Sequence, residues 1–498
     1  MSDEIPDVLP TSAGGTAPSK GHGHPRGHNG GMGGGKGGGG ARLTEGLVSK
    51  QILNLTRYLL MGTLATMSFQ LADAYFVAQL GTSALAALAF TFPMVMILHA
   101  IALGLGTGVT SVVSRAVGNG ELDKARVLTS DAIILAFIVA LIFAIGGLLL
   151  VEPLYDAMGA EPHVLENIKS YMHVWFVGMP VMIVPLIANS VIRAFGDAKF
   201  PSLIMGGTAI LNIFLDPILI FGFGPIPGYG LQGAAIALLI SRFVTFALSL
   251  YVLQARVHGV SYKVPSFGRL LHSWNQLLHI ALPSTATQLI QPVSAGILTT
   301  LIASYGATAV AAYGIATRIE MFALIFVMSL SIAIAPFVGQ NAGAGRLDRV
   351  RDAIKFAYKA SLAYGVVVAG ILAMAGGFIA HEFSDDGAVI ALAAFYLLVV
   401  PVSYGCMGII NISSGSLNAM ARPMPAMVIG AAKSMVIQIP CAYAGSILYG
   451  IKGVFMGIAA STLTVAIIAF ILARRTVRSE LQRADASAIP QTATSAAE

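Results

Sequence analysis

The chain has 498 residues, of which 56% are hydrophobic and only 10% are charged. A soluble domain is about 25% charged, so this composition excludes a soluble globular protein and favours a polytopic membrane protein. The 29 Lys and Arg residues exceed the 23 Asp and Glu residues, which gives a formal net charge of +6. The two cysteines, Cys406 and Cys441, lie in apolar runs, which excludes a disulfide framework and a cysteine-based zinc site.

Residues 1–45 differ in composition from the rest of the chain. They are rich in Gly, Pro, Ser and His and include the run GGMGGGKGGGG. Such a segment buries too little apolar surface to offset its chain entropy, so we predict a disordered tail. No short apolar region with a cleavage site precedes Leu47, so we expect no removable signal peptide.

From Leu55 onward the chain breaks into twelve apolar runs. Each is long enough to cross a bilayer as a helix, which takes about 17–25 residues. Strands of a membrane barrel would be shorter and would alternate, so we predict an all-α integral membrane protein. The predicted spans are 55–78, 84–109, 132–151, 171–192, 202–223, 233–255, 277–303, 309–336, 357–380, 389–412, 425–449 and 453–473.

Lys and Arg gather in alternate connections between these spans. The even-numbered connections hold residues such as Arg115, Lys124 and Arg349, whereas the odd-numbered ones hold only Lys169 and Lys452. Because Lys and Arg accumulate in cytoplasmic loops, we predict a multi-pass protein of the inner or plasma membrane with both termini in the cytoplasm. The excess of Lys and Arg in cytoplasmic loops beside the lipid bilayer accounts for the net positive charge, so no nucleic-acid partner is expected.

An internal repeat divides the chain into two halves. The stretch LGTSALAALAF at 80–90 resembles YGATAVAAYGI at 305–315, an offset of 225 residues. The same offset aligns GNGELDKAR at 118–126 with GAGRLDRVR at 343–351. Each half holds six spans, so both copies enter the membrane in the same direction, as in many transporters. The predicted segments are a Gly/His-rich cytoplasmic tail (1–45), a six-helix bundle (46–257), a cytoplasmic linker (258–275), a second six-helix bundle (276–475) and a cytoplasmic tail (476–498).

Ionisable residues inside the spans are few and informative, because a charge in the hydrocarbon region is costly. Asp73 lies in the first span, three residues after Gln70. Asp216 lies in the fifth span, one helical turn after Asn212. Pro217 removes a backbone hydrogen bond, so a carboxylate, an amide oxygen and a freed carbonyl come together within one turn. Such an oxygen-rich spot can hold a proton or a hard cation such as sodium.

The repeat offers a comparison for both acids. The offset of 225 takes Asp73 to Leu298, and a local offset of 223 takes Asp216 to Ile439. The polar atoms therefore occur in one half only, which favours a task performed there over a requirement of the six-helix unit. The alternative is a buried carboxylate that is merely capped or paired.

The eighth span carries Arg318 and Glu320, two residues apart and so not facing each other. They either line a cavity or pair with other helices, and the sequence leaves both interpretations open. The chain has no Walker lysine loop and no HExxH motif, so ATP-driven transport by this chain alone is disfavoured.

These residues resemble the multidrug and toxic compound extrusion family, the cation-coupled drug antiporters, whose superfamily includes lipid-linked sugar flippases. The resemblance covers about residues 46–475. It implies twelve helices in two bundles forming a V, with drug extruded in exchange for inward protons or sodium. The motifs that carry it are ADAYFVAQLGTSALAALAF from Ala72, RAFGDAKFP from Arg193, LNIFLDPILIFGFGPIPGYGLQGAA from Leu211 and PFVGQNAGAGRLDRVR from Pro336.

The DNA-damage-inducible branch of that family places its coupling residues in the amino-terminal bundle. The resemblance maps this role onto Asp73, Asn212 and Asp216, and onto Asn189 in the fourth span. Another branch uses acids in the seventh and tenth helices, where this chain has amides and no carboxylate. The predicted substrate cavity is lined by Gln70, Gln288, Gln291, Glu320 and Asn411.

The sequence thus predicts a secondary active exporter of amphipathic, often cationic small molecules, working by alternating access as a monomer and not as an enzyme. No cofactor is expected beyond the coupling ion, H⁺ or Na⁺, and sodium, if used, is expected at Asp73, Asn212 and Asp216. One alternative is a flippase of lipid-linked saccharide, which the scarcity of basic residues within spans disfavours. Another is a membrane-embedded aspartyl protease, which would need further convergent catalytic groups.

Overall fold

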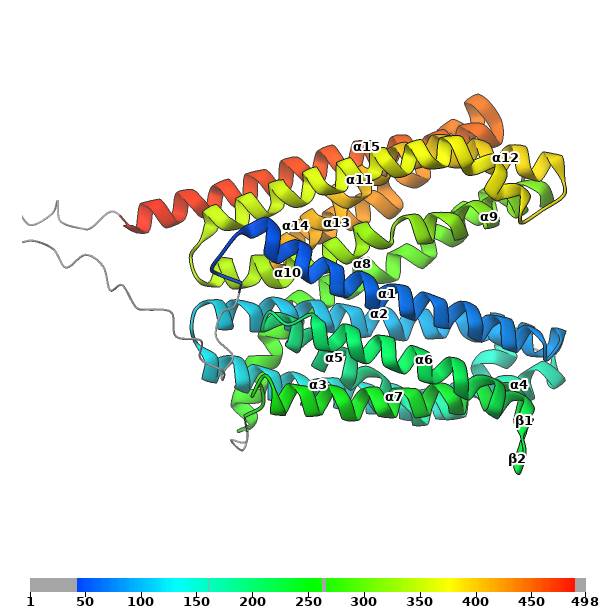
Figure 1. Cartoon of the computed structure of the whole chain (residues 1–498), viewed down its shortest axis with the longest axis horizontal. Coiled ribbons are helices and arrows are strands. Elements are labelled where there is room, and N and C mark those ends of the chain that lie inside the picture. Colours follow the sequence, from blue (N-terminus) through cyan, green and yellow to red (C-terminus); the bar gives the residue numbers. More distant parts are fainter. Residues whose placement is uncertain (1–42, 160, 262–265, 489–498) are drawn as a thin grey trace, which may run out of the picture. The chain divides into compact units, whose positions relative to one another are not determined.

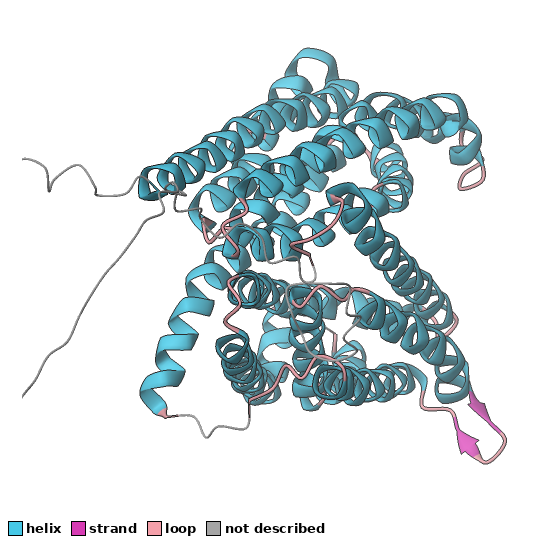
Figure 2. Cartoon of the chain, turned by 60° about the vertical axis from the view of Figure 1, so that its left-hand side comes forward, coloured by secondary structure: helices cyan, strands magenta, loops and turns pink. Residues whose placement is uncertain are grey.

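The structure is a computed structural model that describes residues 43–159, 161–261 and 266–488. These residues belong to one compact unit, Gly38–Glu498, and are almost entirely helical (Figure 2). One hairpin within the described ranges pairs two short antiparallel strands, β1 (Gly222–Phe223) and β2 (Ile226–Pro227). Residues 1–42, which make up most of the predicted tail, lie outside the described residues.

The helices follow the predicted spans in chain order (Figure 1) and extend beyond the apolar runs. Seven predicted spans are single helices: α1 (Val48–Ala78), α2 (Thr82–Gly118), α3 (Leu122–Ala157), α6 (Lys199–Phe221), α7 (Gly230–Ala255), α8 (Phe267–Ala303) and α11 (Leu347–His381). Three are broken: α4 (Pro162–Val177) with α5 (Met179–Ala194), α9 (Ala307–Ala323) with α10 (Ile325–Gly343), and α12 (Gly387–Val399), the 3₁₀ turn η1 (Val400–Ser403) and α13 (Tyr404–Ala419). The last two comprise α14 (Pro423–Ala431), the π-helical segment η2 (Ala432–Val436) and α15 (Gln438–Ala488).

Within the described residues, nine helices are long and apolar enough to cross a membrane, or ten with the bent α4–α5 pair. The prediction of twelve spans differs from the larger number, ten, in two places. The helix α1 is not among the nine, and Pro423–Arg483 is one continuous run of 61 residues. In that run the chain leaves helical geometry at Tyr449 and Gly450. Residues on either side of this break lie against each other, since a Cβ on Gly445 would lie 2.0 Å from the Gly453 carbonyl oxygen. The run is therefore a helical hairpin that supplies two spans.

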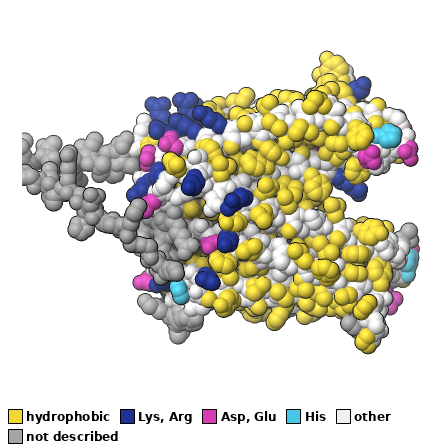
Figure 3. All heavy atoms as spheres, viewed as in Figure 1, with side chains coloured by type: hydrophobic (Ala, Val, Ile, Leu, Met, Phe, Trp, Pro, Cys, Tyr) yellow, Lys and Arg dark blue, Asp and Glu magenta, His cyan; other side chains and the backbone are white. Residues whose placement is uncertain are grey.

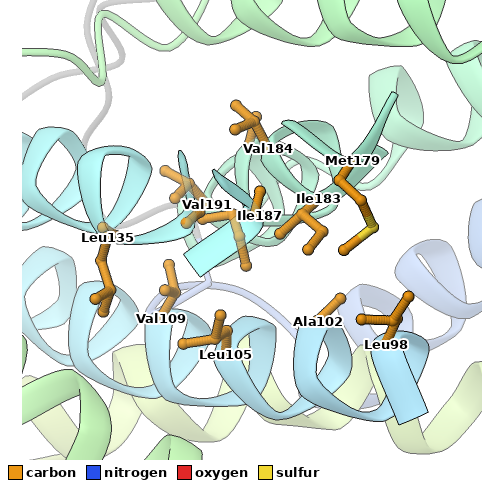
Figure 4. Packing of buried hydrophobic residues seen from close by; sticks show 14 of the residues in the cluster. Leu98, Ala102, Leu105, Val109, Leu135, Met179, Ile183, Val184, Ile187 and Val191 are labelled. Atoms are coloured by element: carbon orange, nitrogen blue, oxygen red, sulfur yellow. The ribbon is translucent and has the colours of Figure 1, made fainter. Parts of the chain in front are cut away.

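Apolar residues form separate cores in the two halves. In the amino-terminal core, Leu98, Ala102, Leu105 and Val109 of α2 recur every three or four residues and face α5 (Figure 4). This spacing places them on one face of the helix. The helices α2–α7 gather in the lower part of Figure 1 and α9–α15 in the upper part. The carboxy-terminal helices pack around two main clusters of their own.

Residues in the first half of α1 and in the first half of α8 are buried in the core of the opposite half. Ile52 and Leu55 of α1 lie in the cluster that contains α10, whereas Leu277 and Ile280 of α8 lie in the amino-terminal cluster. The offset of 225 relates one pair to the other. We call this end of the helical unit, where α1 begins, α15 ends and most Lys and Arg side chains gather, the basic end (Figure 3). The two bundles are tied together there.

At the basic end α2 crosses α10 at close backbone contact. A Cβ on Gly118 would lie 2.0 Å from the Gln340 carbonyl oxygen, and a Cβ on Gly343 would lie 2.1 Å from the Arg115 carbonyl oxygen. The offset of 225 relates Gly118 to Gly343 and Arg115 to Gln340. The repeat thus makes the same contact twice, and only glycine fits at either position.

Asp131 of α3 binds the first turns of α8. Its carboxylate is fully buried and accepts from Arg269 Nη2 at 3.1 Å and from Ser273 Oγ at 2.7 Å, and its carbonyl accepts from Trp274 Nε1 at 2.9 Å. Residues 267–275 belong to the predicted linker, 258–275. The structure corrects this, because these contacts make the segment the start of α8.

Asp131→Ala is expected to lower the free energy of unfolding by about 2 kcal/mol, because Arg269 and Ser273 lose charge-assisted hydrogen bonds. The matched control is Asp123→Ala, whose carboxylate is 87% exposed and pairs with Arg126. Such a surface pair contributes little, so the control should unfold like the wild type. Thermal unfolding of the purified protein measures both variants, and equal shifts would contradict the role given to Asp131.

Two further bounds differ from the prediction. Leu43 and Thr44, which composition assigns to the tail, are buried at 4% and 8% exposure, because side chains of α10 and of the α10–α11 connection bind the backbone there. The helix α15 continues to Ala488, well into the predicted tail 476–498. The hydropathy signal ends earlier, since these last turns are polar.

Candidate functional site

The helices α1 and α6 pack along each other and carry the acids that the sequence singles out. Their packing is close, because a Cβ on Gly62 would lie 3.1 Å from the Cα of Ser202. Asp73 lies in the last turns of α1 and Asp216 in the last turns of α6. Both helices run away from the basic end, so the two acids lie in the opposite half of the bundle.

Asn212 and Asp216 form a buried polar pair on one face of α6. They are 2% and 0% exposed, and Asn212 Nδ2 donates to Asp216 Oδ1 at 2.9 Å. The other oxygens, Asn212 Oδ1 and Asp216 Oδ2, are buried and have no hydrogen-bond partner among the described residues. A buried polar atom without a partner is destabilising, so this pair is suited to receive a proton or a cation.

Asp73 faces this pair from the neighbouring helix. Its side chain is half-buried, and its charge interacts with that of Asp216. Both charges also act on the phenol of Tyr171 in α4. The site therefore joins α1, α4 and α6, and one of its two carboxylates, that of Asp73, is partly exposed.

The donor set consists of oxygen atoms: two carboxylates and one amide. Among the described residues, no group of three or more His, Cys, Asp or Glu side chains could hold a metal ion. Oxygen donors of this kind suit a proton or a hard cation such as sodium, rather than zinc or copper. The predicted sodium residues Asp73, Asn212 and Asp216 thus lie together in the fold.

Asn189 of α5 forms its hydrogen bond with another helix and not with Asn212 or Asp216. It is 4% exposed, and its Oδ1 accepts from Ser249 Oγ of α7 at 3.2 Å. This bond joins α5 to α7 inside the amino-terminal bundle. The structure gives Asn189 a partner in helix packing and, among the described residues, no hydrogen bond to Asp73 or Asp216, so its coupling role stays a prediction.

The amides predicted to line a cavity come from both halves. Gln70 of α1 and Gln291 of α8 are exposed, while Gln288 of α8 and Asn411 of α13 are half-buried. Figure 3 shows the helical unit hollowed between its two groups of helices at the end opposite the basic end. The lining of this hollow by these amides stays a prediction.

A second ionic cluster lies in the carboxy-terminal bundle. Glu320 of α9 is half-buried and accepts a hydrogen bond from the Tyr396 hydroxyl of α12. Lys433 in η2 is 8% exposed, donates to Thr462 Oγ1 at 2.9 Å and interacts with the charge of Glu320. Lys433 is not among the predicted site residues, although it is a lone lysine in the apolar run 425–449, and this was the available signal. π-Helical turns often occur at functional sites, which adds interest to this position.

Comparison with known proteins places the chain among transporters. The protein-family model MatE matches it twice, at residues 59–218 and 283–444, one match in each half of the internal repeat. A FAD transporter of Shewanella oneidensis is 37% identical over 428 residues, which cover 86% of this chain and 95% of that protein. The multidrug export protein MepA of Staphylococcus aureus is 26% identical over 410 residues, which cover 82% of this chain and 89% of that protein.

A solved structure has the same fold. The crystal structure of the Vibrio cholerae MATE transporter VcmN in the bent form superposes with a TM-score of 0.83 at 32% sequence identity. The superposition covers 87% of this chain and 98% of that one. The predicted all-α architecture of two repeated six-helix bundles is therefore confirmed.

Proposed function

This chain belongs to the MatE family of membrane transporters, and we propose that it is a secondary active exporter that exchanges a small molecule for protons or sodium ions. The observation that carries the proposal is the pair of buried oxygens on α6, Asn212 Oδ1 and Asp216 Oδ2, which have no partner among the described residues. A cation or proton at this position would satisfy both. The nearby carboxylate of Asp73 is partly exposed, and we propose it as the route by which the cation enters.

We assign the basic end to the cytoplasm, because Lys and Arg accumulate on that side of membrane proteins. The hollow at the opposite end then faces outward (Figure 3). Two features close the cytoplasmic side: α2 crosses α10 at close contact, and α1 and α8 each bury residues in the core of the opposite half. In this arrangement the coupling site lies in the half of the bundle that the outer solution reaches.

Exchange requires that the cation and the substrate disfavour each other's binding. A ligand shifts a conformational equilibrium only by its difference in affinity for the two states, and the effect of each ligand on the other is reciprocal. Filling the oxygens on α6 would change the packing of α6 against α1, which carries Gln70, one of the residues predicted to line the substrate cavity. Cation binding would thereby release the substrate outside.

Two substrate classes have support. The relative named multidrug export protein supports amphipathic, cationic compounds, which the half-buried carboxylate of Glu320 would attract. The more similar relative, named FAD transporter, supports a flavin dinucleotide, an anion. The amides of Gln288 and Asn411 can both donate and accept hydrogen bonds, so they suit either class.

Transport in proteoliposomes tests the proposal and separates the classes. A fluorescent organic cation and FAD are each supplied under an imposed proton gradient or an imposed sodium gradient. We expect either the proton gradient or the sodium gradient to drive one of the two probes against the concentration gradient of that probe. The rate should be well above that of protein-free liposomes. If neither gradient drives either probe, cation-coupled export is wrong, and lipid-linked saccharides become the substrates to test.

A further inference from the structure

A pocket lies at the basic end, where α2, α3, α8 and α10 meet. It consists of two adjoining hollows of about 330 and 420 Å³ that share Arg115, Lys124 and Gln276. A volume of this size accommodates a small ligand. We call this the basic pocket, and its other polar lining residues are Asn119, Glu121, Asn275 and His279.

The other half of the repeat shows what the equivalent groove binds. There the chain segment 43–46 runs across the end of α10 and the start of α11 and is held through its backbone. The hydrogen bonds run from Leu43 N to Gln340 Oε1 (3.0 Å), from Arg346 Nη1 to the Thr44 carbonyl (2.6 Å) and from Arg349 Nη1 to the Gly46 carbonyl (2.8 Å). The polar side chains of that groove are therefore satisfied by the chain itself.

The offset of 225 maps this groove onto the basic pocket. The residues that correspond to Gln340, Arg346 and Arg349 are Arg115, Glu121 and Lys124. The residues that correspond to segment 43–46 are 268–271, which form the first turn of α8 and bind α3 instead. No described segment fills the groove in this half, and a pocket lies in its place.

Arg115 has hydrogen-bond donors in the basic pocket that can bind a ligand. Its Nε donates to the Ser111 carbonyl at 3.2 Å, while its two terminal nitrogens have no acceptor among the described residues. Two such nitrogens form the planar fork that binds a phosphate or carboxylate through two parallel hydrogen bonds. The guanidinium is half-buried, so water screens its charge less than on an open surface.

The remaining charges leave the pocket cationic. Lys124 Nζ lies 2.8 Å from Glu121 Oε2, and Asn119 Nδ2 donates to Glu121 Oε1 at 2.6 Å. The Lys124 ammonium holds the pKa of the Glu121 carboxyl below its usual range, so this carboxylate is ionised at neutral pH. The pocket thus holds one carboxylate, Glu121, and two cations, Arg115 and Lys124, which leaves it with a net positive charge.

We propose that the basic pocket binds a phosphate-bearing anion, with the Arg115 guanidinium as the bidentate donor and Lys124 and Gln276 as further donors. This goes beyond the proposed function, because the site lies at the opposite end of the bundles from the acids of α1 and α6. A bound anion contacts α2, α3 and α8 beside Gly343 of α10. It therefore strengthens the contact between the bundles at this end.

Isothermal titration of ADP into the full-length protein, held in nanodiscs of phosphatidylcholine, tests the proposal. Arg115→Gln installs the residue found at the repeat-related position and should weaken ADP binding by at least about tenfold, equivalent to about 1.4 kcal/mol. The control is Arg351→Gln, which removes a cytoplasmic-side cation 51% exposed and outside the pocket. That variant should bind ADP like the wild type.

A second arm separates a soluble anion from a lipid headgroup. If the pocket takes a lipid phosphate, nanodiscs containing phosphatidylglycerol should show weaker ADP binding, and Arg115→Gln should retain less of this lipid in native mass spectrometry. Lys124→Gln, at a side chain 57% exposed, provides a second variant should Arg115→Gln fail to fold.

The proposal is overturned if neither ADP nor phosphatidylglycerol binding depends on Arg115 or Lys124. No ion gradient is present in these measurements, so they are independent of cation-driven export. Anion binding can fail while export is confirmed, and export can fail while anion binding is confirmed.

Discussion

Asp216→Asn is expected to abolish gradient-driven transport while leaving the fold intact. The amide has the size and shape of the carboxylate and can still hydrogen-bond with Asn212, but it neither takes up a proton nor offers a negative charge to sodium. Without that exchange the imposed gradient has no site through which to act. The measurement is the initial rate of substrate movement in proteoliposomes, which should fall to that of protein-free liposomes.

Two further variants test whether the loss of transport is specific to the coupling site. Asp73→Asn should lose transport as well, because its charge acts on the same site. Asp385→Asn removes an exposed carboxylate from the α11–α12 connection and should transport normally. Thermal unfolding should be similar for all three variants. If Asp216→Asn transports at the wild-type rate, the coupling site is not on α6, and Glu320 becomes the residue to test.

Gly343→Ala is expected to destabilise the protein by disrupting the contact between α2 and α10. Its Cβ would lie 2.1 Å from the Arg115 carbonyl oxygen, so α2 and α10 must move apart at the basic end. Overpacking of this kind typically costs about 1–3 kcal/mol. We expect a lower unfolding temperature and slower transport, because the state closed at this end is the one that loses its contact.

The repeat provides an internal test of that expectation. Gly118→Ala makes the same clash from the other helix, with 2.0 Å to the Gln340 carbonyl oxygen, and should give a similar loss. Gly146→Ala in the middle of α3 is the control, since nothing lies within 4 Å of its added Cβ. Alanine there should be neutral or slightly stabilising. Wild-type unfolding temperatures for Gly118→Ala and Gly343→Ala would show that this crossing is not a tight contact.

The fold was largely predictable, because apolar run length and the repeat at 225 residues are local properties of the chain. The breaks within spans were not. The bend of 49° between α4 and α5 and the π-helical turn η2 depend on how neighbouring helices pack, which hydropathy does not record. The helix ends were also misplaced, since α2 continues to Gly118 through polar turns that lie beyond the apolar run.

The site was predictable only where its residues share one helix. The spacing of Asn212 and Asp216 predicts their contact, and they form it at 2.9 Å. That Asp73 faces them came from the family resemblance, since no property of α1 alone selects α6 as its neighbour. The partners of Asp131 and Lys433 lie 138 and 29 residues away in sequence. Tertiary packing sets such contacts, and sequence reasoning had no means of finding them.

The most direct test of the account reverses the coupling. Proteoliposomes are loaded with whichever of the two probes, the organic cation or FAD, is transported in the gradient assay. They are diluted into medium without that probe and given no proton or sodium gradient, and internal pH and internal sodium are then followed. Because coupling between two ligands is reciprocal, outward substrate flow should drive the coupling cation inward, and Asp216→Asn should abolish this uptake. Outward substrate flow that moves neither ion in the wild-type protein would contradict cation exchange and with it the role of the oxygens on α6.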